Sequence, residues 1–142
     1  IISYCEKILK DAGAETTLIK NTEEIVLNSD KEQLGRVFLN LIKNSIESIH
    51  QKIEKNINSN KKITIELNNQ DDHINLTIID TGIGFGELKS KIKDILNPYF
   101  TTKKDGTGLG LSIVNKIVND HNGNIDFMSL DNGAKIKIIF SK

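Results

Sequence analysis

The sequence predicts an α+β fold, in which a mixed, mostly antiparallel sheet is covered by helices on one face. Two observations predict it. Some segments place apolar residues at helical spacing, and several short segments alternate apolar with polar residues and come in adjacent pairs. Such alternation is typical of strands with one buried and one solvated face. A chain of 142 residues, 37% of them hydrophobic, suits one globular domain with its own core.

Helices are predicted where the apolar spacing is helical and where capping residues begin or end the pattern. The expected helices cover residues 1–12, ending at Gly13; residues 30 to about 50, beginning at the N-cap Asp30; residues 87–96, ending at Asn97-Pro98; and a last segment that opens in a glycine-rich loop and ends at about His121, before Asn122-Gly123.

Strands are predicted where apolar and polar residues alternate between turn-forming residues. The expected strands cover residues 17–20 and 25–28 as one pair, residues around 63–67 and 74–78 as a second pair joined by a turn through 68–72, and residues 124–130 and 134–140 as a third pair. Asn132-Gly133 between the last two strands predicts a hairpin with a type I′ turn, whose two central residues have positive φ.

Charge and cysteine content exclude several classes of protein. The formal net charge is zero, so the chain lacks the basic character typical of a nucleic-acid-binding protein. Cys5 is the single cysteine, which excludes an internal disulfide and suits a reducing compartment, so we expect a cytoplasmic location. No apolar run is long enough to span a bilayer. The chain starts at Ile1 rather than Met, so we expect a piece of a longer protein.

The stretch GTGLGLSIV contains glycines at every second position, Gly106, Gly108 and Gly110, and then becomes helical in pattern. Its spacing fits neither the Walker A loop nor the Rossmann fingerprint. Exposed backbone N–H groups at a helix N-terminus favour a phosphate, and the missing Cβ atoms allow a close approach. A mobile loop that needs glycine only for its backbone angles is the alternative, and this stretch alone does not decide between them.

The stretch DTGIGFG begins with Asp80 at the end of an alternating segment. A carboxylate there can accept a hydrogen bond from an exocyclic amino group such as that of adenine, and the following glycines would let a flat ring lie against the backbone. Taken alone, the stretch also fits a turn that simply ends a strand.

The long predicted helix carries two asparagines beside its apolar stripe. Asn44 falls at the edge of that stripe, and Asn40 lies one turn earlier, further toward the polar side. A half-buried amide needs hydrogen-bond partners, which a capping or helix-bridging role would supply. The alternative is a neutral oxygen ligand for Mg²⁺, which is commonly held by one or two protein groups together with substrate phosphates.

Together the stretches NLIKNSIESI, DTGIGFG, NPYFTTK and GTGLGLSIV resemble, in order and spacing, the N, G1, F and G2 boxes of the ATP-binding catalytic domain of sensor histidine kinases. The resemblance covers the chain from about Asp30 to the end. The short gap between Phe100 and Gly106 resembles the nitrogen-regulation type of these kinases, which has a short lid. It implies a two-layer α/β sandwich of the Bergerat kind and a single catalytic domain over residues 1–142, with residues 1–13 as a candidate connector helix.

The resemblance implies a role for each matched residue toward ATP and Mg²⁺. Asn44 would ligate Mg²⁺, Asn40 would support the phosphates or the metal site, and Asp80 would bind the adenine amino group. Catalytic roles are implied for Asn40, Asn44 and Lys103. The other implied nucleotide contacts are Gly82, Ile83 and Gly84 at the base, Phe100, Thr102 and Lys103 in a lid that begins at Pro98, and Gly106, Thr107, Gly108, Leu109, Gly110 and Leu111 around the phosphates.

Two residues depart from the family pattern. Glu47 stands three residues after Asn44, where many members carry Lys or Arg close to the phosphates, and Ser45 replaces the usual alanine. Because Glu47 carries no positive charge, we expect Mg²⁺, Lys103 and Lys104 to offset the negative charge of the triphosphate.

The residue at position 40 also favours phosphotransfer over hydrolysis of ATP. Hydrolytic relatives have a water-activating Glu in this place, and an amide cannot act as a general base. The resemblance therefore implies transfer of the γ-phosphoryl group to a histidine, with a gyrase- or MutL-type ATPase and a non-catalytic ATP-binding module as alternatives.

None of the three histidines has the sequence context of a phosphate acceptor, and we interpret His50, His73 and His121 as surface residues. The implied partners are an acceptor-histidine dimerisation domain in the same protein and the receiver domain of a response regulator. We expect the fragment itself to be monomeric.

Overall fold

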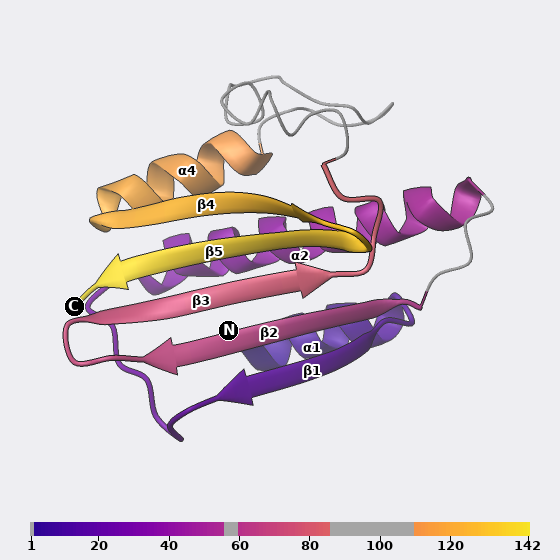
Figure 1. The fold of residues 1–142 in the computed structure, drawn as a ribbon. Coiled ribbons are helices and arrows are strands. Elements are labelled where there is room, and N and C mark those ends of the chain that lie inside the picture. Colours follow the sequence, from indigo (N-terminus) through magenta and orange to yellow (C-terminus); the bar gives the residue numbers. More distant parts are fainter. Residues whose placement is uncertain (1, 56–59, 86–109) are drawn as a thin grey trace.

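A computed structural model describes residues 2–55, 60–85 and 110–142, which form one mixed sheet with helices on a single face (Figure 1). The elements follow the order α1 (Ile2–Asp11), β1 (Glu15–Lys20), α2 (Lys31–Glu54), β2 (Lys62–Asn69), β3 (His73–Asp80), α4 (Gly110–Asp120), β4 (Gly123–Leu130) and β5 (Gly133–Ser141). This arrangement confirms the predicted fold class. The helix expected at residues 87–96 lies outside the described residues.

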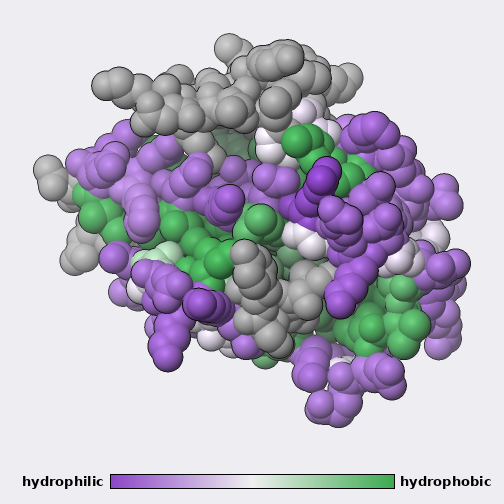
Figure 2. Space-filling model, turned by 180° about the vertical axis from the view of Figure 1, so that it is seen from behind, coloured by the Kyte–Doolittle hydropathy of each residue, from purple (hydrophilic) through white to green (hydrophobic). Residues whose placement is uncertain are grey.

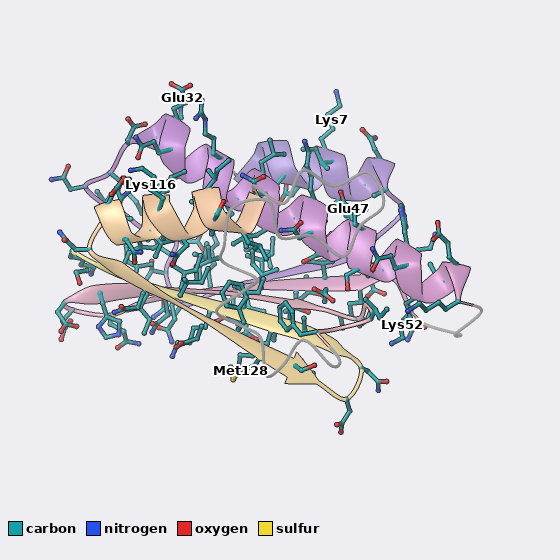
Figure 3. The ribbon with its side chains drawn as sticks, turned by 90° about the horizontal axis from the view of Figure 1, so that it is seen from above. Lys7, Glu32, Glu47, Lys52, Lys116 and Met128 are labelled. Atoms are coloured by element: carbon teal, nitrogen blue, oxygen red, sulfur yellow. The ribbon has the colours of Figure 1, made fainter. Side chains whose placement is uncertain are left out.

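The sheet has the strand order β1-β2-β3-β5-β4. The pairs β2–β3, β3–β5 and β4–β5 are antiparallel, and β1–β2 is parallel. A parallel pair needs a long crossover connection, which α2 provides between β1 and β2. Seen from above, α1, α2 and α4 lie together on one side of the sheet (Figure 3).

The core lies between this helix layer and the inward face of the sheet. Alternate residues of the central strands point into it, including Ile63 and Ile65 on β2, Leu76 and Ile78 on β3 and Ile138 on β5. Val37 and Leu41 of α2 and Val114 of α4 meet them from the helix side and are also fully buried. From behind, the outer surface of the helix layer is largely hydrophilic, with hydrophobic areas between the polar side chains (Figure 2).

Two capping residues lie where the sequence predicts them, Asp30 at the start of α2 and Gly13 at the end of α1. Asp30 accepts hydrogen bonds from the backbone N–H groups of Glu32 and Gln33 at 2.9 and 3.0 Å, as an N-cap does. Gly13 has φ +69°, and Ala14 N–H donates to Leu9 O, so α1 ends in a Schellman motif. Helix α2 continues to Glu54, four residues beyond the predicted end near His50.

The predicted strand pair at residues 17–20 and 25–28 is wrong in its second half. Residues 25–28 have no strand structure, and β1 pairs instead with β2, which is more than forty residues away along the chain. In this register Leu18 lies beside Ile65, so the edge strand extends the apolar inner face of the sheet. Leu27 still packs against the core, although Val26 is exposed.

The hairpin between β4 and β5 is confirmed, but its turn is not type I′. Leu130 pairs with Gly133, so the two central residues of the loop are Asp131 and Asn132, and neither has a positive φ. The positive φ falls on Gly133, at +135°.

Candidate nucleotide-binding site

Asp80 is the most deeply buried carboxylate among the described residues, with 4% of its surface exposed. It is the last residue of β3, between β2 and β5, where the sheet ends under helix α2. Its Oδ1 accepts a hydrogen bond from the backbone N–H of Gly82 at 2.9 Å, which closes an Asx turn. A carboxylate has about four acceptor positions, so this turn leaves Asp80 able to accept further donors.

Burial raises the pKa of the Asp80 carboxyl above its ordinary value, because the low-dielectric surroundings disfavour the charged form. Smaller effects oppose it, from the N–H groups of Gly82 and Ala134, the Ser45 hydroxyl and the positive charge of Lys52. The Ser45 hydroxyl makes no hydrogen bond of good geometry within the described chain, so it acts on Asp80 as a nearby dipole.

Helix α2 holds the backbone that follows Asp80. Ile83 N–H donates to the side chain and the backbone carbonyl of Ser48, at 3.0 and 3.2 Å. A Cβ at Gly82 would lie 2.2 Å from Ser48 Oγ and 2.6 Å from the Ser48 carbonyl carbon, so only glycine allows this approach. Gly84 has φ +71°, a conformation that also favours glycine. Two of the predicted glycines are therefore required by the path of the backbone.

Three of the predicted metal and phosphate residues, Asn40, Asn44 and Gly110, meet where α2 passes the start of α4. Asn40 and Asn44 are both half-buried on α2, one turn apart. A Cβ at Gly110, the first residue of α4, would lie 3.4 Å from Asn40 Oδ1 and 4.0 Å from Asn44 Nδ2. Two amide side chains thus lie beside the N-terminus of an eleven-residue helix, where backbone N–H groups favour an anion.

Part of the predicted site lies outside the described residues: Phe100, Thr102, Lys103, Gly106, Thr107, Gly108 and Leu109. Within the described chain, helix α2 carries the amides of Asn40 and Asn44, and it also holds the turn after Asp80. Leu111 packs against the core. The described residues contain no cluster of three or more His, Cys, Asp or Glu side chains that could bind a metal.

Sequence reasoning missed three contributors. Ser48 and Lys52 hold the turn after Asp80 from α2, and Lys52 donates from Nζ to Thr81 O at 3.2 Å. The signal for Lys52 was available, because it lies three residues after the buried Ile49 and seven after the buried Ser45, on the apolar stripe of the helix.

His121 is the third missed residue, because its interpretation as an ordinary surface residue left out the two contacts that it makes. It is half-buried, and its Nε2 accepts a hydrogen bond from Asp30 N–H at 3.2 Å. Its Nδ1 donates to Ile117 O at 2.8 Å. His121 therefore joins the C-terminus of α4 to the N-cap of α2. His50 is exposed, as expected, and His73 is partly buried and pairs with Asp72.

Known proteins match both the sequence and the structure. The family model of histidine kinase-, DNA gyrase B- and HSP90-like ATPases matches residues 29–142. Sporulation kinase C of Bacillus subtilis is 34% identical over 110 residues, which cover 78% of this chain and 23% of that protein. The sensor histidine kinase ZraS of Escherichia coli O157:H7 is 33% identical over 113 residues, or 79% of this chain and 22% of that kinase.

Among solved structures, the catalytic domain of histidine kinase ThkA superposes with a TM-score of 0.78 at 28% identity, covering 99% of this chain and 86% of that one. The mycobacterial sensor histidine kinase MprB, at 22% identity and a TM-score of 0.74, shares the fold, with 99% of this chain and 91% of that one covered. The chain spans about a quarter of the length of the curated relatives it matches. No helix in the described ranges has the length and apolar character needed to cross a membrane.

Proposed function

Because the chain belongs to the family of histidine kinase-, DNA gyrase B- and HSP90-like ATPases and matches the catalytic domain of sensor histidine kinases within it, we propose that it binds Mg·ATP and transfers the γ-phosphoryl group to a histidine on a separate acceptor domain. The observation that carries the proposal is the placement of the buried Asp80 at the end of β3, and of two amides, Asn40 and Asn44, on α2, the helix that holds the turn after Asp80. Asp80 suits the base of a nucleotide, and the two amides suit its phosphates and their metal ion.

For the base, Asp80 would accept a hydrogen bond from the adenine amino group. Its support is burial, because a carboxylate withdrawn from water discriminates more strongly between a ligand with a donor and one without. Gly82 and Gly84 bring bare backbone next to this carboxylate, and Ile83 supplies an apolar side chain.

For the phosphates, Asn44 would provide an oxygen ligand to Mg²⁺, supported by Asn40. The donors fit the metal, since Mg²⁺ prefers hard oxygen ligands and is usually shared between a few protein groups, waters and substrate phosphates. When bound, the metal would neutralise phosphate charge, which matters more here because Glu47 adds no positive charge. The N-terminus of α4 would bind the phosphates beside these amides.

For the chemistry, the acceptor imidazole nitrogen would attack the γ-phosphorus while ADP leaves. A neutral imidazole is already nucleophilic, so catalysis would consist of positioning and electrostatic stabilisation. Asn40 supports transfer rather than hydrolysis, because its amide cannot remove a proton from water.

The remainder of the parent protein would supply the acceptor histidine on a dimerisation domain, and a response regulator would receive the phosphoryl group. The named relatives are sensor and sporulation kinases several times longer than this chain, which supports such partners. We place the reaction in the cytoplasm, where ATP is available. The short-lid, nitrogen-regulation type stays a prediction.

Phosphotransfer in trans tests this proposal. The chain would be incubated with γ-labelled ATP, Mg²⁺ and the acceptor-helix domain of its parent protein, and label on that domain would be followed with time. We expect acid-labile, base-stable label, as phosphohistidine gives, and much less with the Asn44→Ala variant. Absence of label on the acceptor, although the chain binds Mg·ATP, would contradict the kinase proposal and favour a non-catalytic ATP-binding module.

A further inference from the structure

Lys52 is a buried cation at the end of the candidate site. Only 9% of its surface is exposed, whereas the lysine side chains of most proteins are solvated. It lies near the C-terminal end of α2, on the side that faces the sheet, while Lys7 and Glu32 point away from the sheet (Figure 3). A lysine that interrupts an apolar stripe costs desolvation energy, so its position requires a specific partner.

The partner of Lys52 is the backbone beside Asp80. Its Nζ donates to the carbonyl of Thr81 at 3.2 Å. Ser48, one turn earlier on the same helix, holds Ile83 N–H. Helix α2 therefore fixes the segment after β3 at two points, and the Lys52 contact is the one next to the candidate base-binding carboxylate.

Lys52 takes part in none of the ion pairs between described residues. Its positive charge instead acts on Asp80 and lowers the pKa of that carboxyl, against the effect of burial. A cation in this place would favour the charged, hydrogen-bond-accepting form of Asp80 and fix the turn that orients it.

We propose that Lys52 is a positioning residue for base recognition, which holds the Thr81 carbonyl so that the Asp80 carboxylate faces the exocyclic amino group of the nucleotide. The inference rests on the proposed function, since it assumes that Asp80 reads this amino group. It goes further in assigning part of the preference for the exocyclic amino group to a residue on α2 that would not touch the nucleotide.

Binding of two nucleotides would separate this role from a merely structural one. ADP carries the exocyclic amino group, and purine riboside 5′-diphosphate lacks it but keeps the ring and phosphates. Affinities of both would be measured by calorimetry for the wild-type chain, Lys52→Met, Lys52→Arg and the exposed control Lys7→Met. Thermal unfolding would check that each variant folds.

We expect Lys52→Met to bind ADP roughly three- to tenfold more weakly, as expected for one misaligned hydrogen bond, and to bind the amine-free nucleotide nearly as the wild type does. Lys52→Arg, which keeps a cationic donor, should recover most of the loss, and Lys7→Met should change neither affinity. If Lys52→Met does not fold, Lys52→Leu takes its place, because it also removes both the donor to Thr81 O and the charge, and the same selective loss for ADP is expected.

Equal loss for both nucleotides, or no loss for ADP, would overturn the role of Lys52. Two results with the wild-type chain have a different meaning: binding of neither nucleotide would overturn the proposed function, and equal binding of both would overturn the assignment of the amino group to Asp80. The two failures are therefore distinguishable from the wild-type data alone.

Discussion

At the scale of single residues, Asp80 combines a stability cost with the binding role that we propose for it. The folded protein holds a proton on Asp80 more tightly than the unfolded chain does, because burial raises its pKa. By linkage, its contribution favours the folded state at acidic pH and is lost as the pH rises from the ordinary carboxyl value, about 3.9, through the raised pKa. At neutral pH the buried charge therefore destabilises the fold.

Asp80→Asn should accordingly have opposite effects on stability and on binding. The amide keeps an acceptor for Gly82 N–H and removes the buried charge, so the free energy of unfolding at pH 7 should equal or exceed that of the wild type. ATP and ADP should both bind about ten- to a hundredfold more weakly, since one charge-assisted hydrogen bond at the base is lost. Urea unfolding and calorimetric titration measure the two effects.

The stability difference should shrink toward pH 3, where Asp80 takes up a proton in both the folded and the unfolded state. A variant that is less stable than the wild type at pH 7, or that weakens ATP much more than ADP, would contradict this account of Asp80.

Asn44→Ala should remove the gain in ATP affinity that Mg²⁺ provides and leave the fold largely intact, because the residue is only half-buried. Titrations of ATP with and without Mg²⁺ measure this gain. Asp80→Asn is the matched control, since it should lower affinity and keep the magnesium dependence. A normal magnesium dependence in Asn44→Ala would show that Asn44 does not bind the metal.

At the scale of elements, His121 joins the two helices that carry the amides and Gly110. It accepts from Asp30 N–H and donates to Ile117 O, so both ring nitrogens are used. His121→Ala should lower the free energy of unfolding by about 1–2 kcal/mol through loss of these two hydrogen bonds, of which the one to Ile117 O is partly buried. Urea denaturation measures the change.

His50→Ala is the control for His121→Ala, because His50 is exposed on α2, and its effect should stay within about 0.5 kcal/mol. Equal stabilities of the two variants would mean that the contact between α4 and the N-cap of α2 contributes nothing.

The elements also show which parts of the fold a sequence can predict. Strands β2 and β3 follow from local alternation, and α2 from the N-cap Asp30 and its apolar stripe. The partner of β1 could not be found locally, because its pairing depends on which distant strand presents a free edge with a matching inner face. The turn before β5 is shifted by one residue, because the pairing of Leu130 with Gly133 places Asn132 at its second central position.

The site follows the same rule. Asp80, Asn40 and Asn44 were proposed from short motifs, in which each residue stands beside its own glycines or helical neighbours. Ser48 and Lys52 were missed, since they act on residues 35 and 29 positions further along the chain. Their roles depend on how α2 packs over the end of β3, and neither the sequence of α2 nor that of the segment after β3 predicts this packing by itself.

At the scale of the whole molecule, the arrangement predicts a domain that binds nucleotide but cannot complete a reaction alone. The isolated chain should bind Mg·ATP and neither label itself nor hydrolyse ATP at a useful rate. Self-labelling should fail because His73 pairs with Asp72, His121 is bonded on both ring nitrogens, and exposed His50 lacks the sequence context of an acceptor.

Hydrolysis by the isolated chain should be slow because Asn40 stands where hydrolytic relatives have a general base, and such assistance is typically worth about 10²–10⁴-fold. Incubation with γ-labelled ATP and Mg²⁺, without any partner, measures labelled chain and released phosphate together. Adding the acceptor domain in trans should restore transfer, though weakly, because covalent linkage would otherwise raise its effective concentration. Acid-stable label on the chain would indicate a serine or threonine kinase. Rapid phosphate release without a partner would favour an ATPase of the gyrase or MutL type.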